Sequence, residues 1–434
     1  MRTMTLMLGA AVVLSAASPA RAAPADQAAI RAGAAAVDQQ VIAWRRDIHQ
    51  HPELGNREVR TSKIVADHLR SLGLEVRTGV AHTGVVGVLK GGKPGPVVAL
   101  RADMDALPVT EPAGLPFAST VKAEYNGQQV GVMHACGHDA HTAMLMGVAQ
   151  ILAGMRADLS GTVVFLFQPA EEGVPTGETG GAKQMIAEGA LANPKADVVF
   201  GVHTWPGPPG RLTVRTGGTM AGSDQLYVTV KGRQTHGAMP SKGVDPVTAS
   251  AQIIVGLQTM VTRQMDAAAS PVVISIGKIS GGVRHNIIPD KVEMSGTIRH
   301  LDPETHDAFL DRIRRTIDGI AELAGASADV TIEPYAPPVF NPPELVARMT
   351  PTLERVGAGA GGLLRDAPAT MGAEDFAWYQ KEAPGMYFFL GIDKPGAKPG
   401  APNHSPDFFI NEDALKTGVE AMVSLTLDYM AGGK

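Results

Sequence analysis

Residues 96–105 read PVVALRADMD, a continuous apolar run that ends in charged residues. A run of this kind is typical of a strand that is buried on both faces of a parallel sheet. Two later runs have the same form, since residues 161–167 (GTVVFLF) lead into a glutamate pair and residues 196–202 (ADVVFGV) lead into His203. Helical patterns separate these runs, which predicts a mostly parallel α/β sheet. Ligand sites in such sheets lie at the carboxyl ends of the strands, where these polar residues stand.

The segment from residue 217 to residue 335 follows a different pattern. Its expected elements are a strand, a helix, two strands, a helix and a last strand, over residues 224–232, 246–263, 272–279, 290–300, 303–325 and 328–335. This β-α-β-β-α-β order is the ferredoxin-like motif. A chain of 434 residues is also too long for one ordinary core. We therefore expect a main α/β domain from residues 23–216 and 336–434, with a compact α+β domain inserted at 217–335.

The composition is that of an ordinary globular protein. Hydrophobic residues make up 44% of the chain and charged residues 19%, with a formal net charge of −5. This balance gives no general electrostatic reason to bind nucleic acid or an anionic membrane.

The N-terminus has the pattern of a secretory signal peptide. Arg2 precedes an apolar run over residues 6–17, and Ala20-Arg21-Ala22 is an A-x-A cleavage pattern. The apolar run is too short to span a bilayer comfortably. We therefore expect a signal peptide over residues 1–22, export to the periplasm or secretion, and no membrane partner after cleavage.

The residues that carry chemistry begin with residues 134–141, HACGHDAH, which contain the only cysteine of the chain. Thiolate, imidazole and carboxylate are the ligand set of a borderline-soft divalent metal. In a loop, Gly137 would let the backbone turn so that Cys136 and His138 face one point. About thirty residues later come Glu171 and Glu172, and adjacent glutamates allow one to bind metal while the other moves protons.

Each of these signals is weak alone. A C-x-H pair occurs by accident, a glutamate pair is usually a solvated helix face, and a single histidine such as His203 or His404 is often structural. The glutamate pair, however, follows a buried strand and a proline, where an exposed helical pair is not expected. In combination the residues predict a metal-dependent hydrolase.

Five motifs together resemble those of the aminoacylase, hippurate hydrolase and indoleacetyl-amino-acid hydrolase group of di-metal peptidases. They are residues 101–108 (RADMDALP), 134–142 (HACGHDAHT), 168–172 (QPAEE), 371–375 (MGAED) and 404–406 (HSP). The resemblance covers essentially the whole mature chain. It implies a zinc-peptidase-type α/β catalytic domain, an inserted lid or dimerisation domain, and a homodimer or higher oligomer. It also implies hydrolysis of the amide bond of N-acyl amino acids, hippurate-like or N-acetylated, or of short peptides.

The resemblance assigns roles to individual residues. It implies two divalent ions, held by Cys136 as a bridging ligand and by His138, Glu172, His203 and His404. Glu171 matches the general base and acid that acts on a metal-activated water. Thiolate with imidazole suits manganese, zinc, nickel and cobalt alike, so the identity of the metal stays open. Asp103 and Asp105 match carboxylates that orient the ligands, and Asp139, His141, Glu374 and Asp375 are lesser candidates for the same role. For His134 both roles, ligand and orienting residue, stay open.

Three further matches lie in the inserted segment. His236 resembles a histidine that stabilises the tetrahedral oxyanion, often from across a dimer. Asn286 and Arg299 resemble substrate-binding residues, and an arginine can hold the free carboxylate of an amino acid through a bidentate pair. The alternative for Arg299 is an ordinary surface arginine.

The chain departs from related peptidases at two places. They have a His-x-Asp ligand pair where this chain has Asp103 and Asp105, which fits the cysteine-containing branch of the group. That branch commonly has two glycines before its lid histidine, where this chain has Gln234 and Thr235. The change stiffens this loop.

Three alternatives to an N-acyl-amino-acid hydrolase remain at this point. A dipeptidase or carboxypeptidase on the same scaffold would prefer simple peptides to hippurate-like substrates. A hydrolase that uses Cys136 as its nucleophile with His138 would keep its activity in the presence of a chelator. A non-catalytic binding protein on a decayed fold would have lost some of the motif residues, whereas this chain keeps all five expected metal ligands and Glu171.

Overall fold

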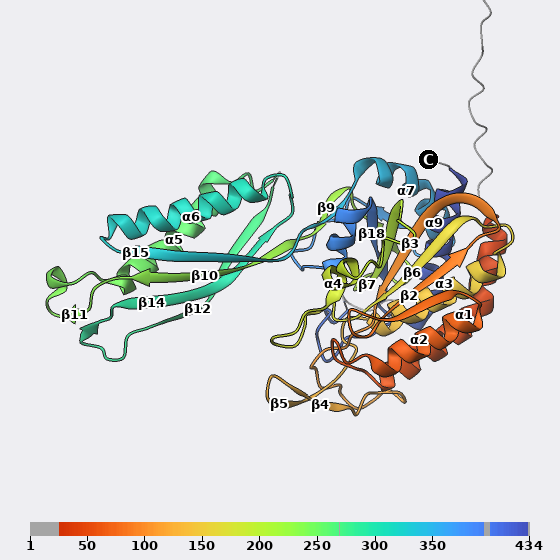
Figure 1. Ribbon diagram of the computed structural model, residues 1–434, viewed down its shortest axis with the longest axis horizontal. Helices are drawn as coiled ribbons and strands as arrows, with labels where there is room; N and C mark the ends of the chain where they lie inside the picture. The colour runs from red at the N-terminus through yellow and green to blue at the C-terminus, as the bar shows by residue number, and fades with distance from the viewer. Residues whose placement is uncertain (1–25, 269, 395–399, 433–434) are drawn as a thin grey trace, which may run out of the picture.

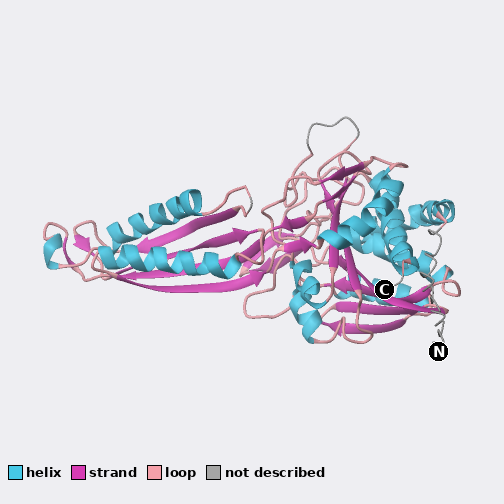
Figure 2. Ribbon diagram, turned by 90° about the horizontal axis from the view of Figure 1, so that it is seen from above, coloured by secondary structure: helices cyan, strands magenta, loops and turns pink. Residues whose placement is uncertain are grey.

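The computed structural model describes residues 26–268, 270–394 and 400–432. A larger part holds both ends of the described chain, and a smaller, elongated part projects away from it (Figures 1 and 2). The signal peptide predicted over residues 1–22 lies outside the described residues. Within the described ranges, no helix has both the length and the apolar character needed to cross a membrane.

An eight-stranded sheet forms the centre of the larger part, in the order β1-β2-β6-β3-β7-β18-β8-β17. Its middle strands β6, β3, β7 and β18 are mutually parallel, while the pairs β1-β2, β2-β6 and β18-β8 are antiparallel. The three apolar runs of the sequence form β3, β6 and β7, which confirms the predicted mostly parallel sheet. The strands are β1 (Glu75–Val80), β2 (Gly84–Lys90), β6 (Ser160–Gln168), β3 (Lys93–Asp103), β7 (Val198–Trp205), β18 (Gly385–Gly391), β8 (Leu212–Val214) and β17 (Leu363–Arg365).

Both faces of this sheet are covered, and for this reason its middle strands are apolar without alternation. In β6, Phe165 and Phe167 belong to one buried cluster, whereas Val164 and Leu166 belong to another on the opposite face. The helices of the first cluster are α1 (Gln27–Gln50), α2 (Val59–Ser71), α3 (His138–Gly154), α7 (Pro343–Gly357) and α9 (Leu415–Ala431). Those of the second are α4 (Gly181–Ala187) and α8 (Tyr379–Glu382).

The smaller part is a four-stranded antiparallel sheet, in the order β12-β14-β10-β15, with helices α5 and α6 against one face (Figure 1). Leu226, Val228 and Val230 alternate along β10 and pack with both helices in a third apolar cluster. This is the predicted ferredoxin-like order, so the fold class is confirmed. The elements are β10 (Gly222–Lys231), α5 (Pro246–Gln264), β12 (Val272–Gly281), β14 (Lys291–His300), α6 (His306–Leu323) and β15 (Ser327–Ala336).

The other named strands of the described residues form short antiparallel pairs outside the two large sheets. Strands β9 (Gly217–Met220) and β16 (Val339–Asn341) pair where the chain passes between the two parts. Strands β11 (Thr235–His236) and β13 (Ile287–Ile288) pair at the far end of the smaller part, and β4 (Lys122–Tyr125) and β5 (Gln128–Gly131) form a hairpin.

The cysteine–histidine motif is only partly a loop. The sequence pattern placed Cys136 and His138 together in a loop, but α3 begins at His138. Gly137 is the residue before the helix, and its φ of 97° turns the chain directly into the first helical turn. His138 and His141 therefore lie one turn apart on a helix, with fixed relative positions.

Candidate metal centre

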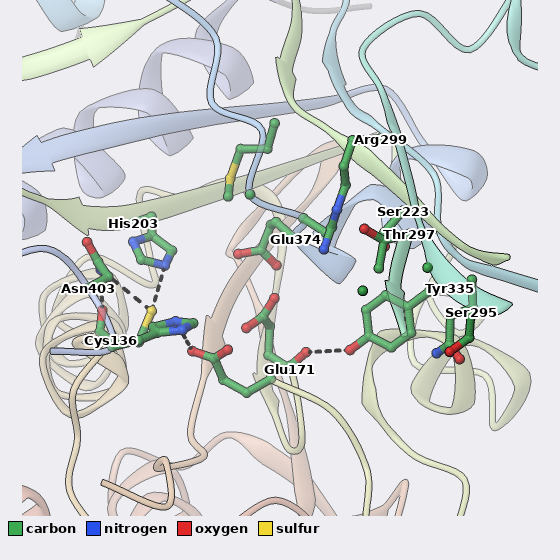
Figure 3. Close-up of a pocket in the computed structure, with 18 of the residues that line it drawn as sticks. Cys136, Glu171, His203, Ser223, Ser295, Thr297, Arg299, Tyr335, Glu374 and Asn403 are labelled. Atoms are coloured by element: carbon green, nitrogen blue, oxygen red, sulfur yellow. Dashed lines mark hydrogen bonds and ion pairs between the residues drawn. The ribbon is translucent and has the colours of Figure 1, made fainter. Parts of the chain in front are cut away.

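The five predicted metal ligands converge at the carboxyl ends of the central strands. Figure 3 shows two of them, Cys136 and His203, beside each other. Cys136, His138 and His203 form one group, in which all ligand atoms lie within 4.8 Å of one another. Cys136 also forms a second group of the same compactness with Glu172 and His404. The thiol is therefore common to both groups, as a bridging ligand must be.

Gly137 determines the geometry between the first two ligands. Its φ of 97° lies in the left-handed region that side chains other than glycine rarely adopt. A Cβ atom at this position would lie 2.1 Å from Oγ1 of Thr204. The glycine between Cys136 and His138 is thus required both by the turn and by the close approach of β7.

His138 presents one free ring nitrogen to the centre. Its Nδ1 lies 3.2 Å from Oδ1 of Asp105, while its Nε2 is buried without a hydrogen-bond partner. This Nε2 lies 3.8 Å from Oε1 of Glu172 and 3.9 Å from Oε2 of Glu171. Such separations are too long for hydrogen bonds and leave room for cations between these groups, since metal–ligand distances are about 2.0–2.2 Å.

The charge around His138 favours a cation. Burial lowers the pKa of its imidazole, but the carboxylates of Asp103 and Asp105 outweigh burial and raise this pKa to about 10. A positive charge is therefore favourable beside Nε2. Burial and the neighbouring carboxylates of Glu172 and Glu171 also raise the pKa of the Cys136 thiol, so a thiolate at this position requires an adjacent cation.

His203 and His141 show how the structure separates a ligand from a supporting histidine. The Nδ1 of His203 donates to the carbonyl of Thr204 at 2.7 Å, which leaves Nε2 as the acceptor, 3.5 Å from Sγ of Cys136. Burial lowers the pKa of His203, which keeps the ring in the neutral form that binds metal. In His141, by contrast, Nδ1 contacts Asp103 at 2.6 Å and Nε2 accepts from the Thr204 amide at 2.8 Å. Because both its nitrogens are engaged, His141 orients the centre rather than binding in it.

His404 lies on the solvent-facing side of the centre. Its backbone has a φ of 68°, and its amide donates to the carbonyl of Ala135 at 2.7 Å, which ties this loop to the cysteine motif. Its Nε2 lies 2.9 Å from Oε1 of Glu172, and its side chain is 54% exposed. Catalytic metal sites keep one side accessible for water and substrate, and the exposed His404 marks that side.

The glutamate pair is positioned by its backbone. The amides of Glu171 and Glu172 donate to the two carboxylate oxygens of Asp105, at 3.1 and 3.0 Å. The preceding Ala170 amide donates to the buried Glu58 at 2.9 Å. Asp105 therefore holds both the loop and His138, as expected of a residue that orients ligands. Burial and then the Glu374 carboxylate raise the pKa of Glu171 well above its ordinary value.

Arg101 organises the carboxylates behind the centre, a role that the sequence reasoning missed. Its guanidinium is buried and donates to Asp103 at 2.7 Å, to Glu374 at 2.9 Å and to Asp375 at 3.1 Å. It also donates to Gln168 at 2.9 Å. The sequence did contain a signal for this role, since Arg101 is a charged residue within an otherwise apolar strand and a buried guanidinium needs carboxylate partners.

The cavity beside the metal centre is lined by both parts of the chain. Arg299 points into it from β14, together with Ser223, Thr297 and Tyr335 (Figure 3). The Nη1 of Arg299 is buried and has no hydrogen-bond partner within the chain. The hydroxyl of Tyr335 donates to the carbonyl of Glu171 at 3.4 Å, which links the smaller part to the catalytic loop.

Two of the predicted residues are not brought to this cavity within one chain. His236 and Asn286 belong to the strands and loop at the far end of the smaller part, and neither lines the cavity. His236 is exposed, and its Nδ1 accepts from the amide of Ala238 at 3.0 Å. Their assigned roles therefore stay predictions that need a second copy of the chain.

Comparison with known proteins places this geometry in a family. Residues 99–428 match the model of peptidase family M20/M25/M40. The chain is 41% identical over 396 residues to thermostable carboxypeptidase 2 of Saccharolobus solfataricus, covering 91% of this chain and 96% of the relative. It is 37% identical over 390 residues to the N-acetylcysteine deacetylase of Bacillus subtilis, covering 89% and 96%.

A solved structure gives the same result. A dinuclear metal-binding peptidase of family M20 from Bacillus subtilis superposes with a TM-score of 0.77 at 35% identity, covering 92% of this chain and 99% of that one. The resemblance drawn from the five motifs is thereby confirmed. The chain belongs to peptidase family M20/M25/M40 and is a hydrolase of that family.

Proposed function

We propose that this hydrolase cleaves the amide bond of N-acyl amino acids with two divalent metal ions. The observation that carries the proposal is the pair of ligand groups that share Cys136, beside a buried Nε2 of His138 without a partner. One ion would be held through His138 and His203, and the other through Glu172 and His404. When bound, such ions acidify water and polarise a carbonyl oxygen.

Glu171 is suited to move the proton in this reaction. Its carboxylate borders the ligand group, and its raised pKa favours accepting a proton from water. Asp105 fixes its amide and Tyr335 fixes its carbonyl, so the side chain has a set direction toward the cavity. After the attack on the carbonyl carbon, the same carboxyl group can give its proton to the departing amine.

Arg299 supports a substrate with a free carboxylate. It extends into the cavity with an unpaired, buried Nη1, although burial lowers its pKa. A carboxylate from the amino-acid half of the substrate would supply the missing acceptor in a charge-assisted hydrogen bond. The hydroxyls of Ser223 and Thr297 add neutral hydrogen-bonding groups to the same wall.

A carboxypeptidase or dipeptidase activity is the second candidate, because a carboxypeptidase stands among the relatives. The substrate of such an enzyme has the same free carboxylate and differs from an N-acyl amino acid only in the group on the other side of the scissile bond. Rates on a hippurate-like substrate and on a dipeptide with the same C-terminal residue separate the two. The burial of Cys136 disfavours its use as a nucleophile, since only 6% of this residue is exposed.

Substitution of Glu171 by glutamine tests the mechanism. The variant removes the proton acceptor but keeps the shape, so turnover of an N-acyl amino acid should fall at least about 100-fold. The metal content should stay that of the wild type. The exposed Glu124, replaced in the same way, serves as the control and should change neither quantity. Substantial turnover by the Glu171 variant, or activity that survives complete removal of metal by a chelator, would contradict the proposal.

We further propose that the mature enzyme is exported and works as a homodimer. The signal pattern over residues 1–22 supports export, and the distant location of His236 supports a role across a dimer. Mixed dimers offer a direct test. A Glu171→Gln chain and a His236→Ala chain, each inactive alone, should regain activity when they are mixed, because each dimer then contains one intact composite site. Absence of any recovery in verified mixed dimers would contradict the proposal.

A further inference from the structure

A buried carboxyl group of the larger part lies outside the cavity and does not serve its own helix. Glu58 is the residue before α2, its exposed fraction is 0%, and it does not line the cavity. An acid at this position commonly interacts with the free amides of the first helical turn, but the Glu58 side chain makes no capping hydrogen bond. Glu53 takes that role, since its two carboxylate oxygens accept from the backbone amides of Arg60 and Thr61, each at 2.9 Å.

The carboxyl group of Glu58 instead joins two segments that are far apart in the sequence. Its Oε1 accepts a hydrogen bond from the amide of Ala170 at 2.9 Å, and its Oε2 is hydrogen-bonded to the hydroxyl of Thr83. Thr83 precedes β2, whereas Ala170 lies in the loop that follows β6. Both oxygens of Glu58 are therefore occupied, and one of them holds the residue next to Glu171.

The loop that contains Ala170 has a backbone that its neighbours must hold. Ala170 has a φ of 51°, in the left-handed region that residues with a side chain rarely adopt. Such a conformation persists only where the surrounding contacts determine it. The amides of residues 170–172 face two carboxyl groups, since Glu58 accepts from the first amide and Asp105 from the next two. Glu58 and Asp105 thus fix three successive peptide groups of the catalytic loop.

The Ala170 amide depends on Glu58 because the loop is closely packed. Ala170 is only 2% exposed. A Cβ atom on Gly55 would lie 3.1 Å from Cβ of Ala170. One on Gly84 would lie 3.0 Å from Cδ of Pro169. These glycines stand close to Glu58 and to its hydroxyl partner in the sequence, so the segments that supply the hydrogen bonds also pack on the loop. Loss of the carboxyl group would leave a buried amide without a partner, which favours displacement of the loop.

The protonation of Glu58 agrees with this arrangement. Burial and then the nearby Asp105 carboxylate raise the pKa of Glu58 to about 8, so its carboxyl group is mostly uncharged at neutral pH. An uncharged carboxyl group has one oxygen that accepts and one hydroxyl that can donate. The Ala170 amide uses the acceptor, and the Thr83 hydroxyl can use the donor. A glutamine side chain offers the same pair of groups with nearly the same shape.

We propose that Glu58 is a positioning residue, which holds the Ala170 amide and so directs Glu171 into the metal centre. Displacement of the Ala170 peptide would move Glu171 with it. The Glu171 side chain has Oε1 3.4 Å from the amide of Asp375 and Oε2 3.9 Å from Nε2 of His138. Catalytic groups must keep such positions closely, since a displacement of about 1 Å can reduce a rate about 100-fold. The inference rests on the proposed function, because it requires that Glu171 moves the proton.

Three substitutions of Glu58 test this proposal, assayed at saturating metal on the N-acetyl amino acid that the wild type hydrolyses fastest. Glu58→Gln keeps the reach and the hydrogen bonds, so its kcat should stay within about threefold of the wild type. Glu58→Leu keeps the volume but leaves the Ala170 amide without a partner, and Glu58→Asp keeps the acid but withdraws it from this amide. Both should lower kcat at least about tenfold, while KM stays within about threefold because the cavity wall is unchanged.

The order of the variants separates positioning from a general structural role. Wild-type kcat in Glu58→Leu, or a kcat that is kept in Glu58→Asp and lost in Glu58→Gln, would overturn the proposal. If Glu58→Leu fails to fold, the glutamine and aspartate variants decide between the two outcomes. Glu53→Leu removes a carboxylate that serves α2, so it should lower the stability to urea and keep kcat. A loss of kcat in Glu53→Leu equal to that in Glu58→Leu would also overturn the proposal.

The Glu171→Gln variant, assayed in parallel, distinguishes failure of this inference from failure of the proposed function. If Glu171→Gln is inactive while Glu58→Leu has wild-type kcat, only the role of Glu58 is wrong. If Glu171→Gln keeps its turnover, the proposed function is wrong and the role of Glu58 is overturned with it.

Discussion

Replacement of Gly137 by alanine probes the turn on which the metal centre depends. The residue joins Cys136 to His138, has a φ of 97° and packs against β7. The new Cβ would lie 2.1 Å from Oγ1 of Thr204 and 3.4 Å from Cδ1 of Ile410. The first distance forces a displacement, because Thr204 is itself fixed by its contacts with His141.

The expected loss of stability has two parts. A residue with a side chain in this backbone region costs about 1–3 kcal/mol. Forcing a methyl group into the packed contact costs about 1–3 kcal/mol more. The Gly137→Ala variant should therefore lose about 4 kcal/mol of unfolding free energy, a large part of the about 5–15 kcal/mol typical of a folded domain.

A matched glycine isolates the backbone part. Gly127, in the turn between β4 and β5, has a φ of 75°, and a Cβ there would meet no atom within 4 Å. The Gly127→Ala variant should lose only the backbone cost, about 1–2 kcal/mol. Both glycines lie in the larger part of the chain, so the same unfolding transition reports on both variants.

Urea unfolding of chelator-treated protein, followed by far-ultraviolet circular dichroism, measures both losses without a contribution from bound metal. The Gly137 variant should also retain less metal after reloading, since the two ligands that flank the turn can no longer face one point. If the Gly137 variant is no less stable than the Gly127 variant and binds metal normally, the reasoning from the close contact is wrong.

Three further outcomes are expected. Arg299→Gln should raise the KM for an N-acyl amino acid about 10–100-fold, since a hydrogen bond to a charged group contributes about 1.5–3 kcal/mol; a substrate whose carboxylate is amidated should show little difference between variant and wild type, and equal losses on both substrates would contradict carboxylate binding. Arg101→Met should destabilise the protein by about 3–5 kcal/mol in urea, because it leaves buried carboxylates without their partner. Arg57→Met breaks the exposed pair with Glu178 and should cost about 0–1 kcal/mol, so similar losses for the two arginine variants would refute the assigned importance of burial. Chelation should abolish turnover, and readdition of a divalent transition metal should restore it, which a rate assay before and after dialysis measures.

The parts of the fold that local patterns determine could be predicted from the sequence. The strands that carry the ligands are apolar because both of their faces are covered, and this signal is contained within a few consecutive residues. The alternation along β10 and the helical periodicity of α6 are local in the same way, with Phe309, Ile313 and Ile317 on the buried face. The convergence of the ligands also followed, since parallel strands end at one edge of the sheet.

What the sequence could not provide depends on contacts between distant residues. The start of α3 at His138 depends on Gly137 approaching Thr204, which is 67 positions away by residue number. The role of Arg101 depends on Glu374 and Asp375, more than 270 positions along the chain. The first contact leaves no trace in the local pattern, and the charged residue within an apolar strand indicates that Arg101 is buried without indicating which carboxylates it meets.

The smaller part shows why its apolar core also controls the chemistry of the cavity. Leu226, Val228 and Val230 pack beneath the two helices, and this fixes which face of β10 each residue occupies. A slip of one residue along the strand would move every side chain to the other face. It would turn Asp224 toward the cavity and turn Ser223 toward the helices. The carboxylate of Asp224 would then lie beside the guanidinium of Arg299 on the neighbouring strand. That guanidinium would then lose its availability to a substrate carboxylate. The substrate preference of the cavity therefore depends on a strand register that residues outside the cavity maintain.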